Sequence, residues 1–408
     1  MKAFPQMTDS PALPTRQPAE VHATVQRLIT LAVRGLEPMF DKQRQLFCHK
    51  LKQTDRGLVQ EGHSQRYTMM TLMGLHRLQQ AGGSSPFESE SILDTLLADL
   101  GWVDNLGDLG VLLWLCALVA PERLAQLEPQ LDLPTAMTRF RGAKQGVTME
   151  LAWFLTGLSY WGLACPEKLP EMERLAFDTY KALTKNRGEQ GFLGHLARSG
   201  SVAGMLRGRV GSFADQVYPI YAMTQFSKAY QHQEARLFAL DCALGICEAQ
   251  GPLGQWWWHY DSVRGRVADG YPVFSVHQHA MGPMTLFALG ETIQHDFRPW
   301  IYKGLQWINS HNELGFNLED GASKLVWRCI YRSRRSLGRY LNTALGRSSE
   351  QIQHERPEDL NVLFECRPYE LGWLLYAFAG RAEHEASVGS EGLHGAKAVL
   401  HGVALGDK

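Results

Sequence analysis

Six stretches of this 408-residue chain are apolar on nearly every side, and no other feature constrains the fold as strongly. A helix without a polar face must be covered by protein all round. Stretches with an ordinary polar face alternate with the apolar ones, so each apolar helix has an amphipathic neighbour to cover it. The six apolar stretches are residues 67–80, 106–119, 148–163, 215–230, 276–289 and 367–379.

The amphipathic stretches complete a set of helical hairpins. They span residues 20–39, 89–100, 121–127, 171–185, 234–248, 300–309 and 336–346. Strand-like runs are too few and too short to form a sheet-based core. We therefore predict an all-α fold, a single (α/α)6 toroid with the apolar helices inside and the amphipathic helices outside. The alternative, an open bundle or solenoid, gives no reason for six helices that are apolar all round.

Three glycine-rich insertions interrupt the helical pattern at residues 186–212, 251–272 and 310–334, and each precedes an apolar helix. In a ring of antiparallel helix pairs, this order gathers them at one mouth. Two insertions predict short β-hairpins, one pairing 256–260 with 266–267 and one pairing 315–318 with 325–331. The toroid is expected over 19–382, between a proline-rich flexible arm, 1–18, and a C-terminal tail, 383–408.

Charge and cysteine content narrow the class of protein. The formal charge is −1 and no long basic run occurs, which argues against a nucleic-acid partner. The longest apolar run, 111–120, is too short to span a bilayer, and the N-terminus has no apolar core of a secretory signal. The odd set of seven cysteines contains no C-x-x-C pair and is typical of free thiols in a reducing compartment, so we expect a cytoplasmic protein.

The aromatic segment 251–272 is the first candidate for a binding site. Three consecutive tryptophans cannot all point inward from an extended strand, because neighbouring side chains alternate faces. At least one is therefore expected to face the mouth, although a single ring packed back onto the barrel is an equally good interpretation. Together with residues at the last two apolar helices, the predicted substrate-binding set is Trp256, Trp257, Trp258, His259, Tyr260, Tyr271, Gln278, Arg367, Tyr369 and Glu370.

Polar residues that suit catalysis lie mostly at the starts of the apolar helices, where free backbone N–H groups favour an anionic or hydroxyl-rich ligand. The candidates are His277, His279, Tyr218, Tyr221, Asp215, Asp261 and Glu365, with Tyr67, Asp104, Asp108 and Glu150 at the same level. Asp261 also suits a turn-former. His277 and His279 have no third ligand at a familiar spacing, so neither a metal nor another cofactor is expected.

The segments GSFADQVYPIYAM, 211–223, and GPLGQWWWHYD, 251–261, resemble the repeats of α/α-toroid proteins, in which a glycine-rich turn and an aromatic residue precede each inner helix. That superfamily includes terpenoid cyclases, protein prenyltransferases, six-hairpin glycosidases, polysaccharide lyases and glucuronyl epimerases. The chain lacks the D-x-D-D acid of the cyclases, the zinc ligands of the prenyltransferases and the Cys-His-Gly of lanthionine cyclases. Its aromatic and charged mouth is similar in character to sugar-processing toroids.

This resemblance implies an enzyme that acts on a glycan or a uronic-acid-containing polysaccharide, by either of two mechanisms. In a lyase or epimerase, His277 or His279 would abstract a proton, Tyr218 or Tyr221 would donate one, and Arg367 would bind the sugar carboxylate. In a glycosidase, two carboxylates among Asp215, Asp261, Glu150 and Glu365 would flank the scissile bond. The alternatives are a toroid that binds a glycan or protein without turnover, or a protein like the cyclases and prenyltransferases.

Overall fold

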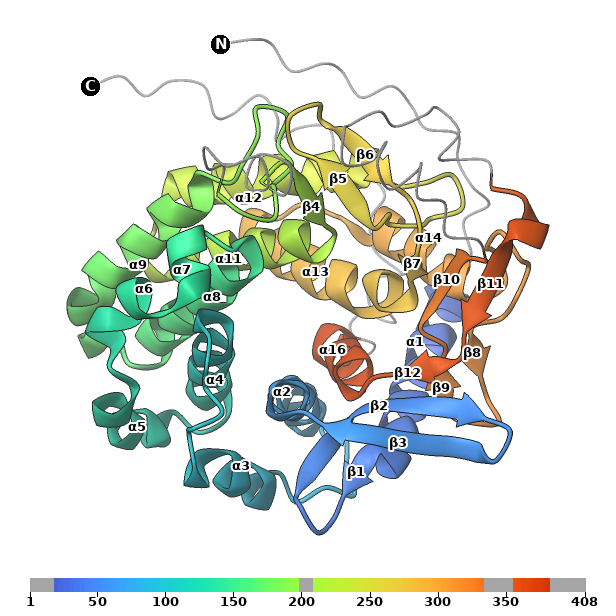
Figure 1. Ribbon diagram of the computed structural model, residues 1–408, viewed down its shortest axis with the longest axis horizontal. Coiled ribbons are helices and arrows are strands. Elements are labelled where there is room, and N and C mark those ends of the chain that lie inside the picture. The colour runs from blue at the N-terminus through green and yellow to red at the C-terminus, as the bar shows by residue number, and fades with distance from the viewer. Residues whose placement is uncertain (1–17, 198–207, 334–354, 382–408) are drawn as a thin grey trace.

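Inner helices stand side by side around a common axis in the computed structural model, which describes residues 18–197, 208–333 and 355–381 (Figure 1). Each inner helix contacts the next, and the last packs against the first, so the ring is closed. Within the described residues these inner helices are α2 (Gln65–Gln80), α4 (Leu106–Val119), α8 (Thr148–Ala164), α11 (Ala214–Ala229), α13 (Gly282–Ile293) and α16 (Pro368–Phe378). The predicted all-α toroid is confirmed, and the open solenoid is excluded by the contact between α2 and α16.

The amphipathic helices wrap this ring from outside (Figure 1). They are α1 (Pro18–Leu36), α3 (Ser89–Ala98), α5 (Leu124–Leu131), α9 (Leu169–Thr184), α12 (Gln233–Glu248) and α14 (Arg298–Ile308). Two short helices, α6 (Ala136–Arg139) and α7 (Arg141–Gln145), lie between α5 and α8. A π-helical turn over His277–Met281 precedes α13, so the fifth inner helix begins irregularly. The apolar pattern therefore predicted the inner helices within a few residues.

Glycine residues let the inner helices approach one another closely. A Cβ atom on Gly110 of α4 would lie 2.3 Å from the backbone nitrogen of Phe154 in α8, and one on Gly157 would lie 2.4 Å from the carbonyl oxygen of Gly110. The same device closes the ring, because a Cβ on Gly74 of α2 would lie 2.1 Å from the carbonyl oxygen of Gly372 in α16. Any larger side chain at these positions would push the helix axes apart.

Aromatic side chains fill the centre of the barrel. Trp114 on α4 is fully buried and stacks on Trp373 of α16, with 5.1 Å between ring centroids. Its ring also lies 5.0 Å from the ring of Tyr221 on α11. The barrel is a packed core with two ends and not an open channel.

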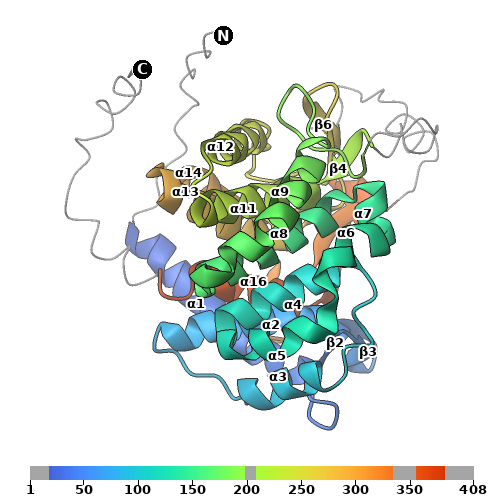
Figure 2. The same cartoon turned by 90° about the vertical axis from the view of Figure 1, so that its left-hand side faces the viewer.

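Short strands lie at the end of the barrel where the inner helices begin (Figure 2). Their bounds are β1 (Phe40–Asp41), β2 (Leu46–Thr54), β3 (Gly57–His63), β4 (Val210–Ser212), β5 (His259–Asp261), β6 (Arg266–Asp269), β7 (Val273–Phe274), β8 (Glu319–Asp320), β9 (Leu325–Val326), β10 (Cys329–Arg332), β11 (Leu360–Leu363) and β12 (Glu365–Cys366). The predicted hairpin of 256–260 with 266–267 is confirmed by the antiparallel pair β5–β6. A second hairpin, β8–β9, also forms, but its first strand is Glu319–Asp320 and not the predicted 315–318, and β10 pairs with β7 and β11. The longest hairpin, β2–β3, was not predicted, and β12 extends it on the other edge of β2.

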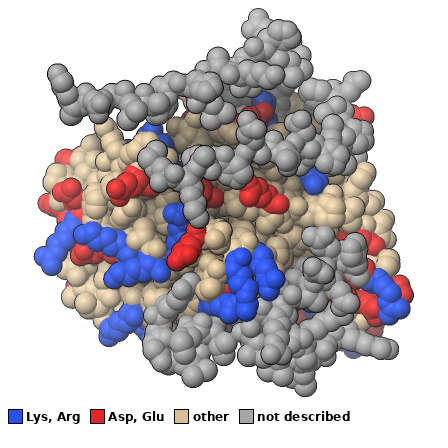
Figure 3. All heavy atoms as spheres, turned by 90° about the horizontal axis from the view of Figure 1, so that it is seen from above, with Lys and Arg blue, Asp and Glu red and all other residues tan. Residues whose placement is uncertain are grey.

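Several expectations can be compared only in part with the described residues. The amphipathic stretch 336–346, the arm except Pro18, and the tail 383–408 lie outside them. All seven cysteines lie within them and are free thiols. None of the described helices is long and apolar enough to cross a membrane. Figure 3 shows acidic and basic side chains interspersed over one face, as the formal charge of −1 leads one to expect.

Candidate functional site

The mouth, meaning the end of the barrel at which the inner helices begin, gathers most of the polar side chains singled out above. Polar caps hold the first two inner helices there. Ser64 accepts a hydrogen bond from the backbone N–H of Tyr67 at 3.2 Å, and Asn105 accepts one from that of Asp108 at 2.9 Å. Such caps fix the first turn of each helix and therefore the side chains that follow.

Two carboxylates and one guanidinium lie together between α2, α4 and α8. Arg66 donates from Nε to Asp108 Oδ1 at 2.5 Å, and Asn105 donates to the other carboxylate oxygen at 2.6 Å. Glu150, on α8, interacts electrostatically with both Arg66 and Asp108. Its Oε2 atom is buried and has no hydrogen-bond partner. Burial raises the pKa of Glu150 above its usual value, against the lowering effect of Arg66.

An aromatic wall backs this carboxylate pair. The guanidinium of Arg66 lies over the Trp153 ring, 5.3 Å from its centroid. Tyr218 meets Trp153 edge-on at 5.0 Å and accepts a hydrogen bond from Trp373 Nε1 at 3.0 Å. Burial raises the pKa of Tyr218, so this hydroxyl stays protonated at neutral pH. These rings form an apolar floor with the polar groups above it.

Arg367 brings a second guanidinium to the mouth from the start of α16. It donates to the Tyr67 hydroxyl at 3.0 Å and to Glu365 at 3.4 Å, while its Nε atom is buried without a partner. Tyr67 packs against Tyr369, with ring centroids 4.6 Å apart, and stacks on His49 of β2 at 5.3 Å. Half-buried tyrosines beside a guanidinium can contact a sugar ring and its carboxylate.

Arg328 connects the two glutamates of this corner. It pairs with Glu365 at 3.1 Å and contacts Glu370 directly. Glu370 is fully buried and accepts from the backbone N–H of Arg367 at 3.3 Å. Glu365 also lies 3.8 Å from Lys50. Both glutamates are thus held in ion pairs that position Arg367, and Glu370 has no exposed surface with which to contact a substrate.

A histidine–aspartate pair lies at the start of α11. Asp215 is buried, and its Oδ2 atom accepts from the backbone N–H and the hydroxyl of Ser212, each at 2.8 Å, and lies 3.1 Å from His195 Nδ1. Because a carboxylate can only accept, Nδ1 carries the proton in this contact, and proton transfer by His195 would involve Nε2. The backbone carbonyl of His195 accepts from Thr148, which begins α8.

Sequence reasoning missed His195 and Arg66. The sequence does contain a signal for His195, because it is the one histidine of the insertion 186–212, which is predicted to lie at the mouth. Arg66 is contiguous with Tyr67, which had been placed at the mouth. Their roles depend on partners 20 and 42 residues away in sequence, and a single sequence does not reveal such partners.

The three tryptophans divide between core and mouth. Trp256 is fully buried and stacks on Phe213, with centroids 5.6 Å apart, and Trp257 is 3% exposed. Trp258 is half-buried and stacks on the ring of His259 at 4.3 Å. Burial lowers the pKa of His259, which also interacts electrostatically with Asp215 and His195. Trp258 and His259 therefore lie beside the histidine–aspartate pair.

The structure contradicts the expectation that a histidine of 277–279 titrates near neutrality. Both His277 and His279 are buried, and burial lowers the pKa of each to about 3. His277 packs against Phe213 at 4.5 Å, whereas neither ring nitrogen of His279 has a hydrogen-bond partner. Gln278 is buried as well and bonds to the backbone of Trp256 through both ends of its amide. These side chains support the wall of the barrel.

The remaining candidate side chains are buried or make their hydrogen bonds to nearby residues. Asp261 accepts from Arg209 Nε at 2.8 Å and from the backbone N–H groups of its own turn, as the turn-former interpretation expected. Tyr260 is fully buried, and Tyr271 donates to Glu313 at 2.7 Å. Tyr221 lies deeper along α11, where its hydroxyl meets those of Tyr160 and Tyr376.

The expected convergence of Tyr218, a histidine of 277–279 and Arg367 occurs only in part. Tyr67 and Tyr369 connect Tyr218 with Arg367. Arg367 donates to the Tyr67 hydroxyl, the Tyr67 ring packs on Tyr369, and Tyr218 interacts electrostatically with both tyrosines. His277 does not join them. Its ring is buried against Phe213 and Phe274, and burial lowers its pKa, so the imidazole stays neutral.

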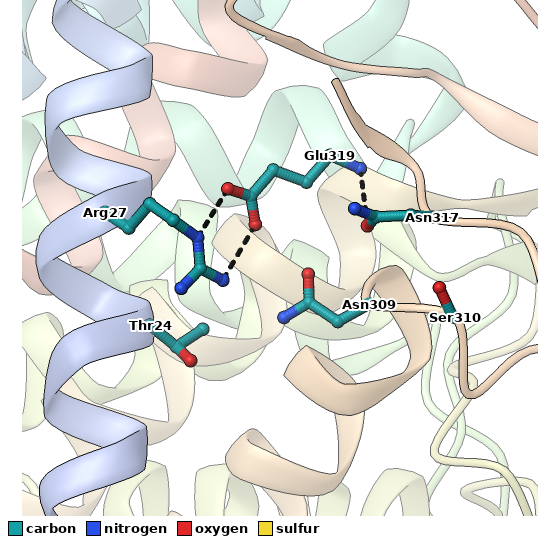
Figure 4. Close-up of a pocket in the computed structure, with 6 residues that line it drawn as sticks. All are labelled: Thr24, Arg27, Asn309, Ser310, Asn317 and Glu319. Atoms are coloured by element: carbon teal, nitrogen blue, oxygen red, sulfur yellow. Dashed lines mark hydrogen bonds and ion pairs between the residues drawn. The ribbon is translucent and has the colours of Figure 1, made fainter. Parts of the chain in front are cut away.

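A pocket of about 340 Å³ opens on the outer wall of the barrel (Figure 4). It lies between α1 and the segment after α14, and Arg27 and Glu319 form a two-point ion pair across it at 2.6 and 3.0 Å. No tryptophan lines this pocket, and the expectation that a tryptophan of 256–258 lines the largest pocket stays a prediction.

No protein-family model matches the sequence, and no curated protein matches it. Solved structures do. A possible member of the GH105 family from Salmonella enterica serovar Paratyphi A has 13% identity and a TM-score of 0.56, covering 94% of this chain and 100% of that one. An unsaturated glucuronyl hydrolase specific for heparin has 12% identity and a TM-score of 0.55, covering 90% and 98%.

A third solved structure is the unsaturated glucuronyl hydrolase from Bacillus sp. GL1, described as responsible for the degradation of glycosaminoglycan. It has 14% identity and a TM-score of 0.51, covering 87% of this chain and 95% of that one. At such identities the likeness concerns the fold. The resemblance to carbohydrate-processing toroids predicted from the sequence is therefore confirmed for the architecture, a complete (α/α)6 barrel over nearly the whole chain.

Proposed function

We propose that this protein is a glycoside hydrolase that removes a uronic acid from an oligosaccharide bound in the mouth of the barrel. One observation carries the proposal: Glu150, with a raised pKa and an unpartnered Oε2, lies beside the Asp108 carboxylate that Arg66 and Asn105 hold. Two neighbouring carboxyl groups in different environments can divide the roles of acid and base. The fold neighbours that act on unsaturated glucuronides support this substrate class.

The chemistry follows from the environment of each group. Burial raises the pKa of Glu150, which favours its protonated form, and this carboxyl group is the proposed proton donor to the substrate. Asp108, which accepts hydrogen bonds from Arg66 and Asn105, is the proposed second carboxylate, which stabilises positive charge that develops on the sugar or activates water. Arg367 and Tyr67 are positioned to bind the sugar carboxylate, and Trp258 offers a ring face for stacking.

The test uses unsaturated uronyl disaccharides from glycosaminoglycans, whose conjugated double bond absorbs ultraviolet light and is lost after hydrolysis. The Glu150→Gln variant should lower kcat by roughly 100-fold to 10,000-fold with little change in KM, because a proton donor acts in the transition state. Glu171→Gln on the outer helix α9, where the side chain is 64% exposed, is the matched control. A Glu150→Gln enzyme with wild-type kcat would refute the assignment.

A lyase or epimerase is the second candidate, because the contact between His195 and Asp215 suits proton abstraction next to a carboxylate. The two reactions have opposite readouts. Elimination from a saturated uronide creates the absorbing double bond, whereas hydrolysis of an unsaturated uronide removes it. Binding of the disaccharide with neither change would indicate a toroid that binds glycans without turnover.

A further inference from the structure

Three tyrosine hydroxyls meet at the far end of the barrel, opposite the mouth. Tyr160 of α8 lies 2.7 Å from Tyr221 of α11 and 2.9 Å from Tyr376 of α16, and the latter two are 2.7 Å apart, each distance joining hydroxyl oxygens. Ten residues of helix separate Tyr160 from Glu150, which corresponds to about 15 Å along the axis. This triangle is therefore distinct from the proposed catalytic site.

Positive charge collects around the triangle without a matching number of carboxylates. The guanidinium of Arg77, on the last turn of α2, lies over the Tyr376 ring at 5.1 Å. Its Nε atom is buried and has no hydrogen-bond partner. Across the described ranges, Arg77 and Lys228 form no ion pair, whereas Arg381 pairs with Glu291. Arg77 is half-buried, and a buried Nε donor without a partner on a guanidinium that has no anionic partner requires an explanation.

These groups line a single pocket of about 60 Å³. Its lining carries three cationic side chains, Arg77, Lys228 and Arg381, and one anionic side chain, Glu291. Lys228 and Glu291 are exposed at its rim, so the pocket is reached from solvent. The volume is far below the roughly 300 Å³ at which drug-sized ligand pockets begin, which excludes a sugar chain and leaves a small ion.

We propose that this pocket, at the far end of the barrel, binds a small oxyanion such as phosphate, sulfate or a carboxylate. Arg77 supplies a half-buried charge, with a planar set of donors suited to such oxygens. The three hydroxyls have three protons, all of which can be shared within the triangle. When an oxyanion enters, a hydroxyl turns outward and donates to it, while its oxygen still accepts from a neighbour.

The binding site also has a mechanical consequence for the barrel. The triangle joins α8, α11 and α16, and Arg77 adds α2, so an anion there contacts four of the inner helices. Trp114 packs on Tyr221 and, through Trp373, connects to Tyr218 at the mouth. Binding at the far end therefore stabilises the same aromatic column that floors the mouth. The proposal does not depend on the reaction catalysed there.

The experiment is calorimetric titration of the full chain with inorganic phosphate at constant ionic strength, with chloride as the reference anion. Saturable binding is expected for the wild type. Arg77→Met should weaken phosphate affinity at least tenfold, and Lys228→Met at least threefold, since each removes a cationic donor. Arg174→Met, at an outer position where the side chain is 95% exposed, should stay within twofold of the wild type.

Further titrations identify the class of anion, and a second variant and a saturation criterion distinguish specific binding from general salt effects. Sulfate and acetate titrations distinguish a tetrahedral oxyanion from a carboxylate. Lys228→Met changes an exposed side chain and preserves the fold, so the test remains decisive if Arg77→Met does not fold. Wild-type phosphate affinity in Lys228→Met would overturn the proposal, and so would wild-type affinity in any folded Arg77 variant. So would a phosphate effect that never saturates, because general salt stabilisation has no saturation point.

Discussion

Removal of Arg328 should expose how the buried glutamate of the mouth is kept in place. Glu370 is fully buried, and Arg328 is the cationic side chain in direct contact with it. Burial raises the pKa of Glu370, while Arg328 has the opposite effect. In the variant Arg328→Met, whose side chain still packs on Phe274, the carboxyl group would lose this partner and take up a proton.

Protonation limits the cost of that change. The usual pKa of a glutamate side chain is 4.5, so keeping Glu370 protonated at pH 7 costs about 3.4 kcal/mol, at 1.36 kcal/mol per pH unit. At pH 5 the same cost is about 0.7 kcal/mol. Between pH 5 and pH 7, Glu370 of the folded Arg328→Met variant keeps its proton, whereas in the unfolded chain most of this carboxyl group is ionised. Its free energy of unfolding should therefore fall as pH rises, relative to the wild type.

Urea unfolding followed by tryptophan fluorescence at pH 5, 6 and 7 measures this slope. The double variant Arg328→Met/Glu370→Gln should lose the pH-dependent part, because no carboxyl group remains to be protonated. Arg356→Met, a surface position where the side chain is 71% exposed, should change the stability by less than about 1 kcal/mol. A destabilisation of Arg328→Met that is the same at pH 5 and pH 7 would refute the reasoning.

Three further outcomes are expected. Asp261→Ala should lower the melting temperature, because Arg209 loses its partner, yet leave kcat unchanged; a loss of kcat with intact stability would restore Asp261 as a catalytic residue. Gly157→Ala should lower the free energy of unfolding by roughly 1–3 kcal/mol through a clash with α4, measured by denaturation, whereas wild-type stability would show that the helices can part freely. If Glu150 is the acid, kcat should fall as pH rises through its raised pKa, whereas a profile that rises in this range would require another donor.

Much of the fold could be predicted from the sequence because burial on all sides leaves a simple signature. The stretches 106–119 and 148–163 lack a polar face, and they became α4 and α8 almost residue for residue. The hairpin β2–β3 was missed because its alternation is weak: most of β3 is exposed on both faces. The π-helical turn at His277–Met281 likewise leaves no distinct pattern in the sequence.

The candidate site was less accessible, since the role of a side chain depends on partners from other hairpins. Asp215 was singled out as a possible acid, but it holds His195 from the preceding insertion. Tyr221 is only three residues beyond Tyr218, yet it lies deeper along the helix and joins Tyr160 and Tyr376. A position near a helix start therefore does not by itself place a side chain at the mouth, because one further turn of helix turns it towards other partners.

Burial favours carboxylate over histidine chemistry in the proposed site. Desolvation disfavours the charged form of either group, so it raises the pKa of Glu150 but lowers that of His277 to about 3. A buried carboxyl group thereby becomes a better proton donor at pH 7, whereas a buried imidazole becomes a weaker base. The same apolar packing that closes the barrel therefore favours the acid between α4 and α8, and leaves the half-buried His195 as the histidine suited to a proton-transfer role.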